Sequence, residues 1–279
     1  MQLQAHHFPS CYKDAFSNLD PENPYIHSNA GLFYLDPNIF GNNAFAYLPS
    51  NMECSTWSVT LLFPKSDSPL DYFLASGWKE IADTYKVLIL FLAPSQNDWE
   101  SNPQEDQRLI TELDKALDNK AHFDVQRFCT YLVGYHKGAE AALRYAMNHP
   151  SSYAGIGLIG SFAGNEIIAA VENSTEQMLP YLELKDIPVP VYLGIPKITE
   201  PLNQIIAHFS RRNKVGNKFI ESNDGIVRYQ TSYRYHHSEI NDHPVARIAI
   251  EINEAFSELI PSCSASAWKE LHQTIRTSG

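Results

Sequence analysis

The chain alternates short apolar runs with stretches in which apolar residues recur at helical spacing. The runs at 58–63 (SVTLLF), 86–92 (KVLILFL) and 127–133 (RFCTYLV) contain few charged residues and favour extended structure. Runs of this kind are typical of strands that are buried on both faces of a parallel sheet. Further strands are predicted at 154–159, 189–193 and 226–235.

Amphipathic segments separate these runs. In 105–119, leucine and isoleucine recur three and four positions apart, and comparable patterns predict helices at 72–85, at 139–150 and around 202–209. A last helix is predicted at 244–259, with its inward face formed by Val245, Ile248, Ala249, Ile252 and Phe256. Strands alternating with helices predict an α/β fold, a mostly parallel sheet with helices on both faces and right-handed crossovers.

The predicted domain boundaries lie where the alternation of strands and helices begins and ends. The first residues are rich in Asn, Pro, Tyr and Phe without helical periodicity, so we expect 1–54 to form an N-terminal extension packed on the main domain. Residues 55–262 then form the main domain, and 263–279 form a C-terminal tail. We find no internal repeat or linker, which predicts a single structural domain overall.

Charge and composition narrow the function classes. The formal net charge is −11, from 21 Lys+Arg against 32 Asp+Glu, and no basic cluster is visible, so nucleic acid is not an expected partner. The four cysteines lie far apart without a C-x-x-C pair, which disfavours a zinc ribbon or a dithiol redox site. The adjacent pairs His6-His7 and His236-His237 lack the spaced partners of a metal site. We therefore expect no metal and no cofactor.

Membrane association is not expected either. No segment approaches the roughly 20 apolar residues that a spanning helix needs. The start, MQLQAHHFPS, lacks the basic and then apolar order of a signal peptide, so we expect a soluble, cytoplasmic protein.

The most informative motif is the segment from Gly134 to Gly138, GYHKG, which lies between a predicted strand and a predicted helix. It has the form of the G-x-S-x-G nucleophile elbow, with His136 in the place of the serine. The glycines of such a turn leave room for a strained backbone and for close approach of a substrate. The pattern predicts that the elbow is retained while its serine is absent.

The sequence around this motif closely resembles α/β-hydrolases of the polyhydroxybutyrate depolymerase and feruloyl esterase type. The matching features are an Asp-x-x-Arg lead-in at 124–127, the elbow itself, and a trailing His-Pro…Tyr-Ala-Gly at 149–155. The segment 76–82 with the strand that follows it looks like the first helix and next strand of the same family, and the resemblance covers about 55–260. It implies an α/β-hydrolase fold and a Ser, Asp, His triad in that chain order.

The resemblance assigns candidate catalytic residues one by one. His136 stands at the nucleophile, Glu200 at the acid position in a turn resembling Gly-x-x-Asp-Pro, and His243 at the base position, in a turn before the last predicted helix. An imidazole is a poor durable acyl acceptor, because it needs a deprotonated nitrogen and a second base. Glu200 is alternatively a carboxylate favoured at a helix start, and His243 a turn or surface histidine.

Candidate pocket residues surround these positions. The oxyanion turn, His-Gly in the family, is here Phe63-Pro64-Lys65, and Pro64 has no N–H to donate to an oxyanion. Tyr135 and Lys137 flank His136, and Lys137 is either an anion-binding group at a helix start or a solvated lysine. Trp99 either lines the substrate cleft or packs against the N-terminal extension.

Three hypotheses on function remain open. The first is an esterase-like homologue that lacks serine-hydrolase activity, a pseudoenzyme that binds a small or ester-like ligand or a partner protein. The second is a carboxylic-ester hydrolase or acyltransferase with altered chemistry, using His136, His243 and Glu200. The third is the inactive half of a homo-oligomer or larger assembly, which predicts a sizeable exposed apolar patch.

Overall fold

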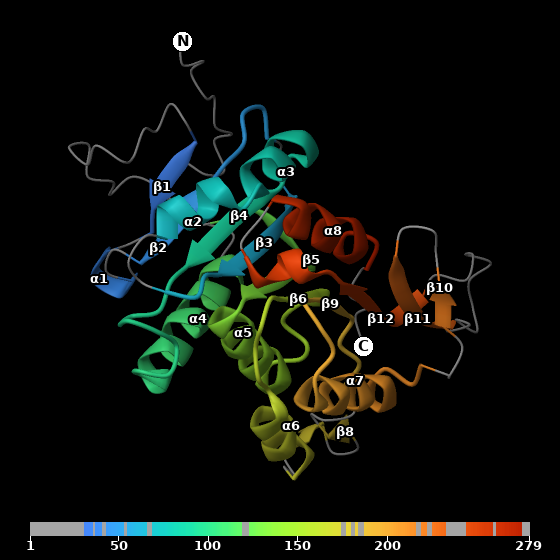
Figure 1. The fold of residues 1–279 in the computed structure, drawn as a ribbon. Coiled ribbons are helices and arrows are strands. Elements are labelled where there is room, and N and C mark those ends of the chain that lie inside the picture. The colour runs from blue at the N-terminus through green and yellow to red at the C-terminus, as the bar shows by residue number, and fades with distance from the viewer. Residues whose placement is uncertain are drawn as a thin grey trace.

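The computed structural model describes residues 31–35, 37–40, 43–52, 55–65, 69–118, 123–173, 177–179, 182–183, 187–215, 219–221, 225–232, 244–258 and 261–274. A large twisted sheet runs through this part of the chain, with helices above and below it (Figure 1).

The sheet has ten strands in the order β1-β2-β4-β3-β5-β6-β9-β12-β11-β10. Its centre is parallel: β3 (Thr56–Leu62), β4 (Leu88–Leu92), β5 (Val125–Tyr135), β6 (Gly155–Ile159), β9 (Val191–Ile195) and β12 (Pro244–Ile252). Antiparallel strands extend it at both ends: β1 (Leu32–Tyr34), β2 (Ala44–Tyr47), β10 (Phe219–Glu221) and β11 (Ile226–Ser232). A separate pair is formed by β7 (Gln177–Leu179) and β8 (Leu182–Glu183). The predicted fold class is confirmed.

Helices cover both faces of the sheet (Figure 1). Apolar residues of one face pack with α2 (Pro69–Ala75), α3 (Trp78–Tyr85) and α8 (Pro261–Leu271). Residues of the other face pack with α4 (Pro103–Asp118), α5 (Lys137–Asn148), α6 (Asn165–Glu172) and α7 (Glu200–Arg212). The short α1 (Pro37–Phe40) and a 3-10 turn, η5 (Glu254–Ser257), complete the described elements.

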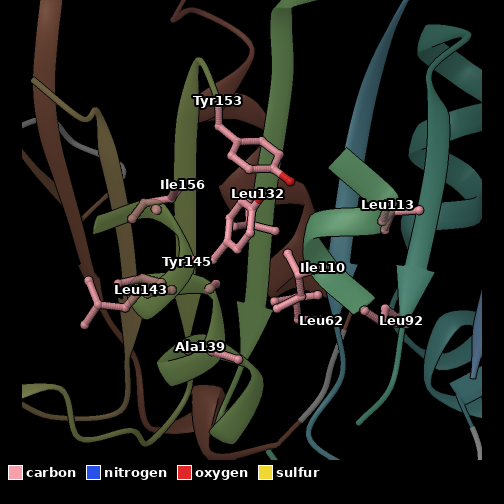
Figure 2. Close-up of a cluster of buried hydrophobic side chains, with 14 of the residues drawn as sticks. Leu62, Leu92, Ile110, Leu113, Leu132, Ala139, Leu143, Tyr145, Tyr153 and Ile156 are labelled. Atoms are coloured by element: carbon pink, nitrogen blue, oxygen red, sulfur yellow. The ribbon is translucent and has the colours of Figure 1, made fainter. Parts of the chain in front are cut away.

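The two-residue period of β5 distributes its side chains between these two layers. Leu132 packs on the side of α4 and α5, whereas Tyr131 and Tyr135 point to the side of α3 and α8. Figure 2 shows the first side, where Ile110 from α4 and Leu143 from α5 belong to the same buried cluster as Leu132. Because both faces of β5 are buried, its sequence is almost continuously apolar from 129 to 135.

A buried polar cluster joins α4, β5 and α5 beneath this core. The Asp114 carboxylate accepts hydrogen bonds from Arg127 Nη2 at 2.6 Å, Tyr145 Oη at 3.0 Å and Ser152 Oγ at 2.8 Å. Arg127 also pairs with Asp118 through Nε at 2.6 Å. The arginine of the Asp-x-x-Arg lead-in is therefore a structural anchor that holds the start of β5 against α4.

The predicted helix at 72–85 is two helices, α2 and α3. Gly77 adopts φ 78°, a left-handed conformation that ends the helical path, and the Ser76 hydroxyl donates to the Phe73 carbonyl at 2.7 Å. Sequence periodicity did not detect the break, because the apolar residues on either side keep helical spacing.

The predicted helix at 244–259 is wrong, because 244–252 form strand β12, parallel to β9. The spacing of Val245, Ile248, Ala249 and Ile252 fits a helix, but β-branched residues also favour strands, and pairing with β9 and β11 settles the structure. The terminal helix is instead α8, which begins at Pro261 and continues into the segment 263–279 assigned to a tail, and its Trp268 is buried in the core. Strands β1 and β2, assigned to an extension, belong to the main sheet.

Candidate functional site

His136 is the single residue that connects β5 to α5. Its backbone has φ 50° and ψ −114°, a conformation that residues with a side chain rarely adopt. Holding a histidine there costs on the order of 1–3 kcal/mol, which the surrounding structure must offset. The chain therefore reverses from strand to helix within one strained residue, and the His136 side chain emerges at the carboxyl edge of the parallel strands.

Two glycines make this sharp turn sterically possible. A Cβ atom at Gly134 would lie 2.2 Å from the Gly138 carbonyl oxygen, and a Cβ at Gly138 would lie 2.1 Å from the Leu62 carbonyl oxygen. Both distances are far inside normal contact. The first turn of α5 thus packs directly on the backbone of β3 and β5, as the two flanking glycines of the motif predict.

The imidazole of His136 lies against the loop that follows β6. Its Nδ1 accepts a hydrogen bond from the Ser161 backbone N–H at 3.2 Å, and its own backbone N–H donates to Ile159 at 2.8 Å. A Cβ at Gly160, which has φ 96°, would lie 2.6 Å from the ring. Glycine at 160 therefore provides the space that the imidazole fills.

The protonation state of this ring follows from its surroundings. Burial lowers the pKa of His136 below its usual value, since the charged imidazolium loses hydration. An Nδ1 that accepts from an amide carries no proton, so the neutral ring holds its proton on Nε2. Within the described residues, no histidine or carboxylate is hydrogen-bonded to this ring.

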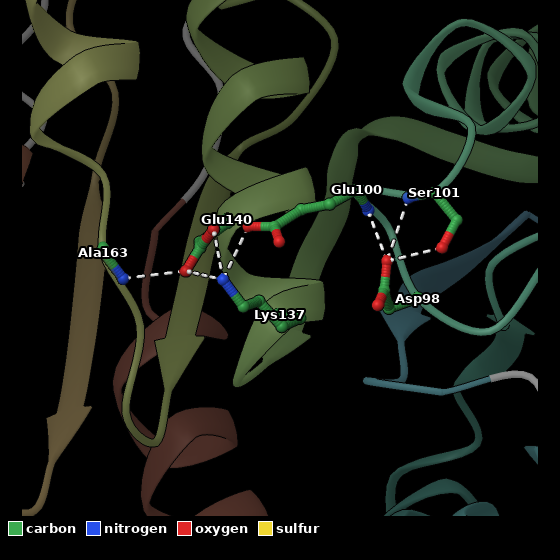
Figure 3. Close-up of polar contacts among 6 residues, drawn as sticks. All are labelled: Asp98, Glu100, Ser101, Lys137, Glu140 and Ala163. Carbon is green, nitrogen blue, oxygen red and sulfur yellow. Dashed lines mark hydrogen bonds and ion pairs between the residues drawn. The ribbon is translucent and has the colours of Figure 1, made fainter.

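Lys137 forms an ionic bridge above the turn (Figure 3). Its Nζ lies 2.6 Å from Glu100 Oε1 and 3.3 Å from Glu140 Oε1. The hydrogen bond to Glu100, followed by the charge of Glu140, raises the pKa of Lys137. Because two carboxylates already neutralise the ammonium, Lys137 is not an open anion-binding group in this structure.

Glu140 ties the helix to a second loop. It is 8% exposed, and its Oε1 accepts the Ala163 backbone N–H at 2.8 Å. On the other side of the bridge, Asp98 accepts from the backbone N–H groups of Glu100 and Ser101, both at 2.9 Å (Figure 3). The loops that follow β4 and β6 are therefore both fixed to the start of α5.

Sequence reasoning missed three of these residues, Glu100, Glu140 and Ser161. Glu140 carried a usable signal, because it lies three positions after Lys137 on one helix face. The other two depend on contacts between loops far apart in sequence. The only general signal was their position after parallel strands, whose carboxyl ends share one edge.

No protein-family model and no curated protein sequence matches this chain. Solved structures, by contrast, match this chain in fold. The acetyl xylan esterase from Aspergillus awamori superposes with a TM-score of 0.55 at 10% identity, over 84% of this chain and 92% of that one. The glucuronoyl esterase from Solibacter usitatus gives a TM-score of 0.52 at 12% identity, over 87% of this chain and 80% of that one. The chain has the α/β-hydrolase fold.

Within the α/β-hydrolase fold, the predicted pocket residues occupy different environments. Tyr135 is fully buried, and its hydroxyl contacts Trp78 Nε1 at 2.7 Å and Ser264 Oγ at 2.6 Å, so it is a core residue. Trp99 is also buried, and its indole N–H donates to the Phe63 carbonyl at 2.6 Å.

Pro64 is half-buried and Lys65 is exposed, both at the carboxyl edge just after β3. The Phe63 N–H is engaged by the Leu92 carbonyl at 3.0 Å, and Pro64 has no N–H. Phe63 and Pro64 therefore offer no free backbone N–H to an oxyanion.

Of the other two predicted triad positions, the structure describes Glu200. Glu200 begins α7 after β9 and is exposed, and its side chain makes no hydrogen bond or ion pair in the described part of the chain. This position agrees with the alternative interpretation of Glu200, a carboxylate that is favoured at the start of a helix. His243 lies outside the described residues, and its role stays a prediction. The next residue, Pro244, begins β12 at the edge opposite to His136.

The described ranges hold no group of three or more His, Cys, Asp or Glu residues arranged to bind a metal ion. Both adjacent histidine pairs of the sequence lie outside those ranges. None of the described helices combines the length and apolar character required to cross a bilayer.

Proposed function

We propose that this chain is an esterase-like α/β-hydrolase homologue in which His136 occupies the nucleophile position, and that it binds a ligand or a partner protein without serine-type ester hydrolysis. The observation that carries this proposal is the strained strand-to-helix turn at His136, with Gly134 and Gly138 in close backbone contact. Those features match the steric requirements of a nucleophile elbow.

The state of the imidazole supports the absence of covalent catalysis. A nucleophilic nitrogen needs a free lone pair, but the Nδ1 of His136 accepts the Ser161 amide and Nε2 carries the proton. Covalent attack would first require that this hydrogen bond break or that a base remove the Nε2 proton. Among the described residues, none is hydrogen-bonded to Nε2 as such a base would be.

The oxyanion side of the site supports the same conclusion. Catalysis of acyl transfer needs two preorganised N–H donors, one after the nucleophile and one from the loop after β3. The first is retained as the N–H of Lys137, which begins α5 and has no intrahelical acceptor. The second is weakened by Pro64 and by the use of the Phe63 N–H in the sheet.

One observation favours the alternative, an ester hydrolase or acyltransferase that uses His136, Glu200 and His243. The lowered pKa of His136 keeps the ring neutral at pH 7, which is the state that a general base requires. This alternative predicts histidine-dependent turnover.

The test is hydrolysis of p-nitrophenyl acetate and butyrate by the protein and by His136→Ala, His136→Ser and His149→Ala. His149 is a matched control, because it lies at the other end of α5 and reports background imidazole reactivity. We expect the protein, His136→Ala and His149→Ala to show the same near-background rate. Turnover that is lost in His136→Ala and kept in His149→Ala would overturn the proposal in favour of the alternative.

The serine variant tests the assignment of the elbow itself. Turnover that appears only in His136→Ser would support the assignment of residue 136 to the nucleophile position and show that the remaining machinery can still act. A labelled serine in His136→Ser after treatment with a fluorophosphonate probe, with no label in His136→Ala, would give the same information without relying on a particular substrate.

A further inference from the structure

A pocket of about 510 Å³ lies at the amino-terminal edge of the sheet, opposite to His136. Its walls come from the starts of β3 and β5, the end of α3, the end of α8 and the segment before β3. The pocket residue Thr56 lies six residues before Leu62, which pairs with Gly134, so at about 3.3 Å per residue the pocket is separated from His136 by more than about 20 Å. It is therefore independent of the site at the elbow.

Aromatic rings form one side of this pocket. Trp268 is 2% exposed and holds the others in place, with ring centroids 6.1 Å from Trp57, 5.5 Å from Tyr85 and 5.4 Å from His272. Tyr85, by contrast, is 55% exposed. The pocket thus combines a rigid aromatic wall with an exposed ring, and ring faces of this kind pack against the C–H faces of a ligand.

Some polar groups of the pocket already form hydrogen bonds within the protein, whereas others do not. The Lys86 ammonium donates to the Ser50 carbonyl at 2.9 Å, and the Thr56 hydroxyl donates to the Lys86 carbonyl. The side-chain amides of Asn51 and Gln126 have no hydrogen-bond partner within the described residues. A primary amide donates and accepts, which suits a hydroxyl group on a ligand.

Charge narrows the ligand class further. The nine lining residues include no carboxylate, so a cation has no counter-charge among them. The one ammonium is already engaged, which also disfavours an anion. A neutral molecule with apolar C–H faces and many hydroxyl groups fits both the aromatic wall and the free amides.

We propose that this pocket binds a neutral sugar of one or two pyranose rings, separately from the site at His136. The volume lies within the about 300–1,000 Å³ of typical small-molecule sites. Tyr85 and Trp57 stack on the sugar ring, and Asn51 and Gln126 hydrogen-bond to its hydroxyl groups.

To test this proposal, the protein is titrated with cellobiose, xylobiose and maltose, and binding is measured by saturation-transfer NMR and isothermal titration calorimetry. The variants are Tyr85→Ala and Gln126→Ala, with Phe128→Ala as the matched control. Phe128 is a 51% exposed aromatic residue on β5 that does not line the pocket. Both changed pocket residues are at least partly exposed, so all variants are expected to fold, and circular dichroism checks this.

We expect at least one disaccharide to bind with a Kd in the millimolar range, weakened about five- to tenfold by Tyr85→Ala and by Gln126→Ala and unchanged by Phe128→Ala. No binding of any of the three sugars would overturn the proposal. Binding that survives both pocket variants would place the sugar elsewhere and would overturn it equally. Tetramethylammonium and benzoate serve as charged probes, and tight binding of either in place of the sugars would refute the assigned ligand class.

Discussion

The close contact between α5 and β3 makes Gly138→Ala a direct test of the turn geometry. The added methyl group would lie 2.1 Å from the Leu62 carbonyl oxygen and 2.8 Å from its carbon. Both partners are backbone atoms of the central sheet, so neither can rotate away. Overpacking of this kind costs about 3 kcal/mol, at the upper end of the usual range.

A smaller effect acts in the opposite direction. Alanine is favoured over glycine inside a helix by about 1 kcal/mol, because it loses less conformational entropy. The net expectation is a destabilisation of about 2 kcal/mol or more, which corresponds to a decrease in Tm of about 4–8 °C for a domain of this size.

The assay is urea and thermal unfolding of Gly138→Ala followed by circular dichroism, with Gly155→Ala as a matched control. At Gly155 the new methyl group would meet the Thr274 hydroxyl at 3.0 Å and a Leu271 methyl at 3.2 Å, both side-chain atoms that can shift. We expect the control to lose less than about 1 kcal/mol. Equal effects at the two positions, or a Gly138→Ala protein as stable as the original, would refute the packing argument.

Three further predictions concern polar groups. Burial lowers the pKa of His136, so its neutral ring contributes stability that is present above about pH 6.5. This stability is lost as the pH falls through the folded-state pKa of His136. NMR titration of the ring and unfolding at several pH values check this prediction. Asp114→Asn leaves the partly buried Arg127 without its main counter-charge and should cost up to about 3 kcal/mol, whereas Asp118→Asn, at the exposed partner, should cost less than about 1 kcal/mol in the same urea series. Tyr135→Phe removes a hydroxyl that contacts two buried polar groups and should cost about 1–3 kcal/mol without changing the His136 titration.

The local geometry of the turn was predictable, whereas the contacts around it were not. Two glycines flanking a histidine between an apolar run and a helix-forming segment specify a sharp strand-to-helix turn, since no other residue fits at 134 or 138. The partners of the His136 ring come from the loop after β6, and no local pattern encodes that approach. Periodicity failed for the same reason at 244–252, where the neighbouring strands β9 and β11 determined the conformation.

Tyr135 shows a second limit of sequence reasoning. Its place next to His136 suggested a pocket residue, but successive residues of a strand point to opposite faces, and the face of Tyr135 is covered by α3 and α8. Adjacency to a functional position along a strand is thus weak evidence for a shared cavity.

The bridge from Glu100 through Lys137 to Glu140 also affects how this end of the molecule fluctuates. Two loops that are distant in sequence are fastened to one helical turn, by the Glu100 ion pair on one side and by the Ala163 and Ser161 amides on the other. Separate loops would open independently, but loops tied to a common anchor tend to open as one cooperative unit. Amide hydrogen exchange at 161–163 and at 100–101 should therefore respond together to salt, which screens the exposed ion pair.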